Sequence, residues 1–385
     1  MFITIRMNNN CYDTIIIGAG ISGLACAKHL QEYGEDFLLI SKNIGGRILT
    51  SDDGTVNYGA FFVCSDYQHV LKYVKLHSKI KLSDFCFHED DDIYVLFEPK
   101  LLAYSFQFMK ILKILYKFRK AFRKFRKNSE TISQKKAIEQ DPFLYELYMK
   151  DAINFVKERK LQAGTDKYLS KGLYSTTFST IQEMNAFSYL QFLLPLITPI
   201  YTFTFEKDKM IKSFQDKIIL DTVTDVHFQK NNYKIKTNNQ IFQSKNIVLA
   251  TEINSSKHFA DIKKTNKPVS TYMYHVKGSP KDIILRKKYQ MFSTLSDVQA
   301  IADLQDGTYL FYYKNKHPPL EKYFYKFRVI DSHFWDPAGT INGHILIESN
   351  RGNNMYLIGD YNIAGLEESF ISGIYAAKQI IKSNT

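Results

Sequence analysis

The chain has 385 residues, of which 45% are hydrophobic, so it can bury a large core and is not a disordered chain. A length of this size predicts two domains. The 51 Lys and Arg residues outnumber the 39 Asp and Glu residues and give a formal net charge of +12, which favours contact with phosphates, anionic lipid or an acidic partner but indicates no fold.

A glycine-rich turn lies between a strand and a helix near the N-terminus. Residues 12–17 have the apolar character of a buried strand, and GAGISG at residues 18–23 leads into a helical pattern. Gly18 permits the tight turn, Gly20 lets the backbone approach a pyrophosphate, and Gly23 lets the helix pack closely on the strand. Phosphates would meet the N-terminus of this helix, where Ser22 lies. The segment therefore predicts a dinucleotide site.

The second strand, residues 36–40, arrives at the distance expected for a dinucleotide-binding βαβ unit. Such a strand usually ends with Asp or Glu, which holds the ribose hydroxyls. Here Ser41 and Lys42 occupy that place. Two interpretations stay open at this point: a site for the 2′-phosphate of NADP, or an FAD site in which Ser41 alone holds the ribose.

A strongly basic segment follows between Pro99 and Ser129, where ten Lys or Arg residues occur without an acid. Apolar residues recur there at spacings of three and four, which predicts one apolar stripe on a helix near residues 104–128. The stripe consists of Phe108, Ile111, Leu115, Phe118, Phe122 and Phe125. Because the cations have no acidic partner one turn away, we weigh an anionic membrane surface equally with a plain solvated helix. Nucleic acid ranks third, since no base-reading module is evident.

Residues 184–205 form a run of 22 residues without a charge, which is long enough for a transmembrane candidate. Gln191, Pro195 and Pro199 interrupt the run, so we interpret it as buried core. The four cysteines show no CxxC spacing, and the N-terminus lacks the pattern of a secretory signal. These features favour a cytoplasmic protein, with peripheral membrane contact through the basic helix as an alternative.

Further motifs share a fixed order along the chain. Gly45-Gly46-Arg47 and residues 57–60 follow the second strand. Residues 217–251 then alternate strands and turns, with strands expected at 218–220, 232–236 and 247–250. Residues 355–360 precede residues 365–373 and a final helix. This succession resembles the flavin-dependent amine oxidase superfamily, including its phytoene desaturase and protoporphyrinogen oxidase relatives. The resemblance covers a little under half of the chain.

The resemblance implies an FAD site, which it builds from several segments. Arg47 would contact the phosphate region, Asp360 would accept hydrogen bonds from the ribityl chain, and the amide of Glu367 would face the pyrimidine edge of the flavin. Val223 would lie near the adenine and Ala250 near the pyrophosphate. The candidate cofactor-binding residues are Gly18, Gly20, Ser22, Gly23, Ser41, Gly45, Gly46, Arg47, Gly59, Ala60, Val223, Ala250, Gly359, Asp360 and Glu367.

Some positions depart from the pattern of the superfamily. Ser41 stands in place of the ribose-binding acid, and Asn57 replaces an aspartate before Gly59-Ala60. Ser369-Phe370 replaces a small Gly-Ala pair. No cysteine follows Cys86, so we expect the FAD to be non-covalent. No catalytic triad or metal cluster is identifiable, and Trp335, the single tryptophan, is a weak catalytic candidate at a position where the superfamily often carries an aromatic residue.

The sequence thus predicts an α/β protein in which a Rossmann-type FAD-binding domain accompanies an α+β substrate domain. The first domain is discontinuous and comprises residues 1–65, 206–260 and 345–385, while residues 66–205 and 261–344 form the second. The expected function is FAD-dependent, amine-oxidase-like transfer of a hydride from a small-molecule substrate. Alternatives are desaturation or oxidation of a lipid-like substrate at a membrane surface, and flavin binding without turnover. The oligomeric state stays open.

Overall fold

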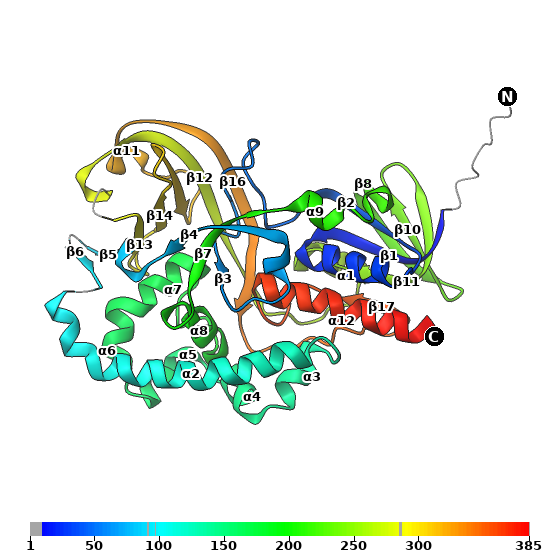
Figure 1. The fold of residues 1–385 in the computed structure, drawn as a ribbon, viewed down its shortest axis with the longest axis horizontal. Coiled ribbons are helices and arrows are strands. Elements are labelled where there is room, and N and C mark those ends of the chain that lie inside the picture. The colour runs from blue at the N-terminus through cyan, green and yellow to red at the C-terminus, as the bar shows by residue number, and fades with distance from the viewer. Residues whose placement is uncertain (1–9, 91, 97, 285–286, 385) are drawn as a thin grey trace.

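The computed structural model describes residues 10–384 except 91, 97, 285 and 286. Its elements divide between two seven-stranded sheets, which lie at the two ends of the long axis in Figure 1. A small three-stranded sheet joins them: β3 (Val63–Cys64), β7 (Ile200–Phe205) and β4 (Val74–Ile80). The mixed α/β architecture expected from the sequence is confirmed.

The first sheet has a parallel centre, which is typical of a Rossmann unit. Its order is β8-β2-β1-β11-β10-β9, with β17 paired in parallel to the second half of β11. Only β10 and β9 run antiparallel to their neighbours. The strands are β1 (Cys11–Gly20), β2 (Phe37–Gly45), β8 (Ile218–Leu220), β9 (Val223–Gln229), β10 (Asn232–Thr237), β11 (Ile241–Leu249) and β17 (Met355–Leu357).

Helices α1 (Ile21–Glu32) and α12 (Leu366–Asn384) pack side by side on one face of this sheet. Their contact is close because glycines meet backbone there. A methyl group added at Gly373 of α12 would lie 2.2 Å from the carbonyl oxygen of Ser22, and one added at Gly23 would lie 1.9 Å from that of Gly18. The other face carries α10 (Ile253–Phe259).

The second sheet has the order β16-β12-β15-β14-β13-β5-β6 and is antiparallel except where β13 pairs with β5. Long strands β12 and β16 connect its upper part to the middle of the molecule (Figure 1). The strands are β5 (Phe85–Glu89), β6 (Asp92–Val95), β12 (Lys267–Pro280), β13 (Tyr289–Phe292), β14 (Val298–Asp303), β15 (Thr308–Tyr313) and β16 (Phe324–Asn342).

A layer of helices lies beneath the second sheet in Figure 1. It consists of α2 (Ser105–Asn128), α3 (Gln134–Glu139), α4 (Pro142–Met149), α5 (Ala152–Glu158), α6 (Gln162–Gly164), α7 (Ser170–Thr177) and α8 (Ala186–Phe192). Two shorter helices, α9 (Lys207–Ile211) and α11 (Leu320–Tyr323), lie elsewhere. Residues 184–205, the uncharged run, form α8, a 3-10 turn at Leu194–Leu196 and β7. In the described part of the chain no helix is long and apolar enough to cross a membrane.

The apolar stripe of the basic helix lies inside the protein. Phe118, Phe122 and Phe125 of α2 are buried and meet Phe187 of α8 edge to face, with ring centres 5.3 to 6.3 Å apart. The hypothesis that this stripe lies in a bilayer boundary is therefore wrong. Periodicity shows that one face of a helix is apolar, but it does not show whether that face meets protein or lipid.

The contact of Gly23 with Gly18 predicts a large difference between two glycines of one motif. Gly23→Ala should lower the free energy of unfolding by about 2 kcal/mol, because the added methyl group overlaps backbone that has little room to move. Gly20→Ala is the matched control and should cost less than about 1 kcal/mol, since its methyl group enters open space. Denaturant unfolding of both variants without added cofactor measures the difference; equal losses would contradict the packing.

Candidate functional site

One large cavity lies between the two halves of the molecule and has a volume of about 1340 Å³. A pocket for a single small molecule usually measures roughly 300 to 1,000 Å³, so this cavity has room for a cofactor together with a substrate. Segments 17–22, 45–48 and 58–62 line it from the Rossmann half. Segments 175–178, 195–200, 289–291 and 333–339 line it from the other half.

The glycine turn after β1 forms a cradle at one end of the cavity. Gly18 has a φ of +105°, which favours glycine, and no described atom lies within 4 Å of a methyl group built on Gly20. Gly46 lies against this turn, since a methyl group there would be 2.9 Å from Gly20 Cα. The cradle adjoins the N-terminus of α1, whose first turn has no acidic residue. Backbone amides and the helix dipole thus favour an anion in the open space.

The structure brings together the predicted cofactor residues, with two exceptions. Gly18, Gly20, Ser22, Ser41, Gly45, Gly46, Arg47, Gly59, Ala60, Val223, Ala250, Gly359 and Asp360 line the cavity. Gly23 lies behind the turn, where it packs on Gly18. Glu367 is buried away from the cavity lining, and its carboxylate accepts hydrogen bonds from the backbone amides of Gln68 and His69 at 2.7 and 2.9 Å.

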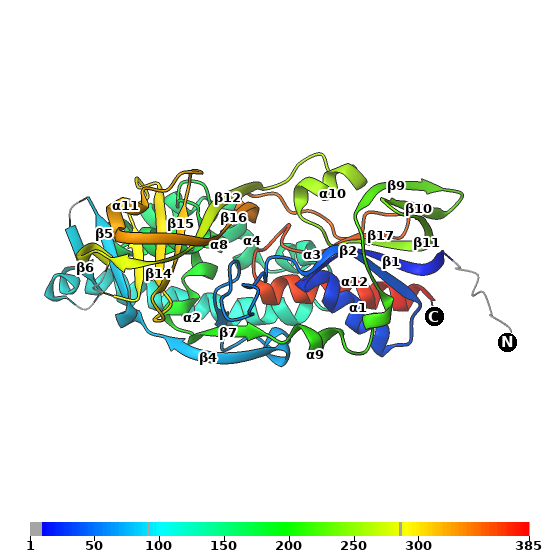
Figure 2. The ribbon, with the colours of Figure 1, turned by 90° about the horizontal axis from the view of Figure 1, so that it is seen from above.

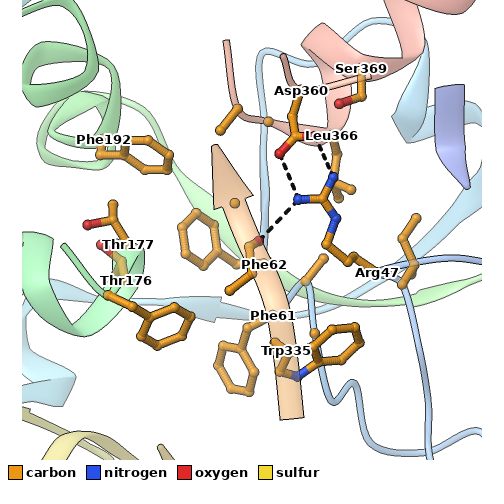
Figure 3. Close-up of a pocket in the computed structure, with 18 of the residues that line it drawn as sticks. Arg47, Phe61, Phe62, Thr176, Thr177, Phe192, Trp335, Asp360, Leu366 and Ser369 are labelled. Carbon is orange, nitrogen blue, oxygen red and sulfur yellow. Dashed lines mark hydrogen bonds and ion pairs between the residues drawn. The ribbon is translucent and has the colours of Figure 1, made fainter. Parts of the chain in front are cut away.

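Arg47 and Asp360 bind each other across 313 residues of sequence. Two guanidinium nitrogens of Arg47 donate to the two carboxylate oxygens of Asp360 at 2.6 and 2.7 Å, and Arg47 also donates to the carbonyl of Ala338 (Figure 3). Asp360 is buried, whereas about one-third of the Arg47 side chain is exposed. Burial opposes ionisation of Asp360, but the charge and hydrogen bonds of Arg47 outweigh it and hold the pKa of Asp360 below its usual range.

The positions that depart from the superfamily pattern have structural partners. The Ser41 hydroxyl donates to the carbonyl of Asn43 at 2.8 Å. Asn57 is buried, and its side-chain amide donates to the carbonyl of Phe203 at 2.7 Å. Ser369 lines the cavity, while the ring of Phe370 stacks on that of His69 with centres 5.5 Å apart. The bulk introduced by Phe370 is therefore accommodated outside the cavity.

The first turn of α12 closes the cavity beside Asp360. Gly365, Leu366 and Ser369 line it, and Glu368 points toward α2. The carboxylate of Glu368 accepts a hydrogen bond from Nε of Arg126 at 2.7 Å, and both side chains are buried. Burial raises the pKa of Glu368, although the charge of Arg126 opposes this shift. Arg126 thus ties the basic helix to the start of the helix that borders the site.

Beyond the cradle, the cavity widens into a space that we call the aromatic chamber. Figure 3 shows Phe192, Thr176 and Thr177 on one side of it and Phe61, Phe62 and Trp335 on another. The chamber is lined by Phe61, Phe62, Thr176, Thr177, Phe192, Thr198, Tyr289, Tyr312 and Trp335. Apart from Trp335, sequence reasoning missed these residues, because they come from segments that carry no recognisable motif.

Trp335 contributes to both the core and the chamber. Its indole nitrogen donates to the carbonyl of Tyr58 at 3.2 Å, and its ring lies 4.1 Å from that of His333.

Two other lining groups, the hydroxyls of Thr198 and Tyr289, have no hydrogen-bond partner among the described residues. Their side chains are only 3% and 6% exposed, so a bound molecule could satisfy them inside the chamber.

Comparison with known proteins relates this architecture to solved oxidases and an isomerase. Residues 16–75 match the family model of the NAD(P)-binding Rossmann-like domain. Similar solved structures include putrescine oxidase bound to putrescine, with a TM-score of 0.68 and 11% identity, covering 97% of this chain and 99% of that one. The chain shares the fold of this oxidase. The resemblance predicted from the sequence is thus confirmed for the fold.

Two further structures of this fold have different substrates in their names. Cyclohexylamine oxidase from Brevibacterium oxydans IH-35A has a TM-score of 0.65 and 15% identity, covering 97% of this chain and 99% of that one. A fatty acid isomerase from P. acnes has a TM-score of 0.66 and 14% identity, covering 96% and 98%. No curated protein sequence matches the chain. One fold thus serves chemically unlike substrates.

The pair formed by Arg47 and Asp360 predicts a defined dependence of stability on pH. A depressed folded-state pKa means that the contribution of Asp360 is present above its unfolded pKa of about 3.9 and is lost as pH falls through the folded pKa. Asp360→Asn should therefore lower the free energy of unfolding at pH 7 by about 3 kcal/mol, and this difference should shrink below about pH 4.

Denaturant unfolding of the wild type and this variant from pH 3 to 7, with no cofactor added, measures the difference. Asp216→Asn is the control, because Asp216 is exposed and has no ion pair among the described residues. If Asp360→Asn lowers the free energy of unfolding by the same amount at every pH in this range, the result would contradict the ion pair.

Proposed function

We propose that the cavity binds FAD non-covalently and that the chain is an FAD-dependent oxidoreductase built on the fold of the amine oxidases. The observation that carries this proposal is the meeting of distant motifs in one cavity. The glycine turn at Gly18–Gly20, the Gly45–Arg47 loop and the Gly359–Asp360 strand end all line it, and a second chamber continues beyond them. A site for NAD or NADP needs only the first of these motifs, the glycine turn.

The positions of the lining residues support a place for each part of FAD. The open space at Gly20, next to the N-terminus of α1, suits the pyrophosphate. Ser41 and Val223 would lie on the adenosine side, while Asp360 and the first turn of α12 would border the ribityl chain and the flavin ring. Lys42 could also meet a 2′-phosphate of NADP, but that alternative gives no role to the segments around Asp360.

When bound, an oxidised flavin accepts a hydride, and the protein supplies binding, orientation and exclusion of water. The aromatic chamber serves this purpose, because its rings keep water away from the reacting carbon. The substrate would give up a hydride to the cofactor and a proton to solvent. Dioxygen or another electron acceptor would then restore the oxidised cofactor.

The lining of the chamber favours a substrate with an apolar body. Among described residues, four acids line the cavity, and none belongs to the aromatic chamber. Asp360 is paired with Arg47, Asp221 and Glu252 follow strands of the Rossmann sheet, and Asp336 is exposed. A diammonium substrate would therefore lack a carboxylate partner in the chamber, and unpaired charges are costly to bury.

We accordingly favour a lipid-like substrate, for which the hydroxyls of Thr198 and Tyr289 would bind a polar group. A solved protein of the same fold is a fatty acid isomerase, which makes this substrate class compatible with the architecture. An apolar amine is the second candidate, since cyclohexylamine oxidase also shares the fold. Flavin binding without turnover is the third.

An anionic membrane remains the proposed partner, although the buried phenylalanine stripe of α2 is not the surface that would meet it.

The cradle at Gly20 predicts that a larger side chain there excludes the cofactor. Gly20→Val should abolish FAD retention, because its side chain would fill the space proposed for the pyrophosphate. Gly172→Ala is the matched control, since it also lines the cavity but its methyl group meets only the sulfur of Met291, at 3.6 Å. Flavin absorbance after gel filtration measures occupancy, and full occupancy in Gly20→Val would refute the placement.

The apolar chamber predicts which compounds reduce the flavin under anaerobic conditions. Absorbance of bound flavin should bleach with an unsaturated fatty acid and should not bleach with putrescine; cyclohexylamine tests the second candidate. Tyr289→Phe should slow bleaching by a reactive compound but preserve stability, because its hydroxyl makes no hydrogen bond to any described residue. Fast bleaching by putrescine would contradict an apolar substrate, and no bleaching by any compound would favour flavin binding without turnover.

A further inference from the structure

The face of α2 opposite its buried stripe is divided into an apolar end and a basic end. Leu102, in the 3-10 turn before α2, is 76% exposed, and Phe106 and Met109 are 77% and 70% exposed. Farther along the same face, exposed cations recur at helical spacing: Lys113, Lys117, Lys120, Lys124 and Lys127. We call this surface, from Leu102 to Lys127, the α2 outer face.

The cations of the α2 outer face are short of anionic partners. Lys113, Lys120, Lys124 and Lys127 form no ion pair within the described residues, and α2 itself contains no acid. Nearby Asp66 is already engaged by Arg123 and Arg126. Mutual repulsion along the helix would be relieved by a partner that carries many negative charges.

The large cavity reaches this same face. Tyr116 is 55% exposed on α2 and also lines the cavity. Arg119 contacts the cavity wall beside Tyr116. Its guanidinium donates to the carbonyl of Ile197 at 3.1 Å and lies 5.0 Å from the centre of the Tyr116 ring. Ile197 lines the cavity too. An opening beside Tyr116 would thus face whatever binds the α2 outer face.

We propose that the α2 outer face docks on an anionic lipid bilayer, with Leu102, Phe106 and Met109 inserted at the headgroup boundary and the lysines bound to headgroups. The two ends match the two layers of a bilayer surface, since large apolar side chains favour the acyl boundary and cations favour anionic headgroups. Docking does not depend on flavin, whereas delivery of a lipid-like substrate through the opening at Tyr116 rests on the proposed function. The docked opening would let such a substrate pass from lipid to the aromatic chamber without crossing water.

Flotation of the full chain with vesicles tests the docking. Binding should occur to vesicles of phosphatidylcholine with phosphatidylglycerol, be weak to phosphatidylcholine alone, and fall as salt is raised. Replacing Lys113, Lys120, Lys124 and Lys127 with glutamine should weaken binding more than about a hundredfold, because each cation near an anionic surface contributes about a fivefold effect. Leu102→Ser, Phe106→Ser and Met109→Ser together should weaken binding while the salt dependence persists.

The control removes four charges at the other end of the molecule. Lys230, Lys234 and Lys236 are exposed on the β9 and β10 hairpin, and Lys257 is exposed on α10, which packs beside β9. The hairpin lies far from α2 in Figures 1 and 2. Their replacement with glutamine should leave binding almost unchanged. Equal losses in both quadruple variants, salt-independent binding, or no binding by the wild type would overturn the proposal, as would self-association through α2 in the absence of lipid. Flavin content is measured separately, so loss of flavin with retained docking would count against the proposed function alone.

Discussion

The architecture depends on close backbone contacts around the first turn of α1. Gly23 lies against the carbonyl of Gly18, Gly46 against Gly20, and Gly373 of α12 against Ser22. These contacts bring the second glycine loop and the last helix to the end of β1, and no side chain larger than hydrogen fits between the partners. Gly20 differs from the others because its open side faces the cavity. A single turn therefore both holds the Rossmann half together and leaves space for a ligand.

Charged side chains then connect this turn to the rest of the molecule. Arg47, just after β2, pairs with Asp360, just after β17. At the start of α12, Glu367 accepts backbone amides of residues 68–70 and Glu368 binds Arg126 of α2. Buried charges persist only when they are paired or hydrogen-bonded, so these partners fix the relative positions of the segments. The cavity lies where all of these segments meet.

Much of the Rossmann half could be predicted from the sequence because its signals are local. The expected strands near residues 12–17, 36–40, 218–220, 232–236 and 247–250 correspond to β1, β2, β8, β10 and β11. Strand β9 was not predicted, because its apolar and polar residues alternate less clearly and most of its residues are exposed. The order of the glycine motifs predicted the fold, and comparison with solved structures confirms that fold.

Other features could not be predicted, because they depend on which distant segments meet. Arg47 and Asp360 were expected to contact the cofactor separately, and nothing in their sequence neighbourhoods indicates that they bind each other. The sequence of α2 favours a membrane surface and a plain solvated helix equally, but its phenylalanines pack on Phe187 of α8 inside the protein. The aromatic chamber combines side chains from β13, β16, α7 and α8, none of which carries a motif.

Three distant motifs are proposed to hold one FAD molecule. Hydrogen–deuterium exchange of the cofactor-free chain, before and after addition of FAD, tests this arrangement most directly. We expect slower amide exchange at residues 18–22, 45–47 and 359–366 together, since bound FAD would cover all three segments. Slower exchange at residues 18–22 alone, equal to that caused by NADP, or no change at any of them, would contradict it.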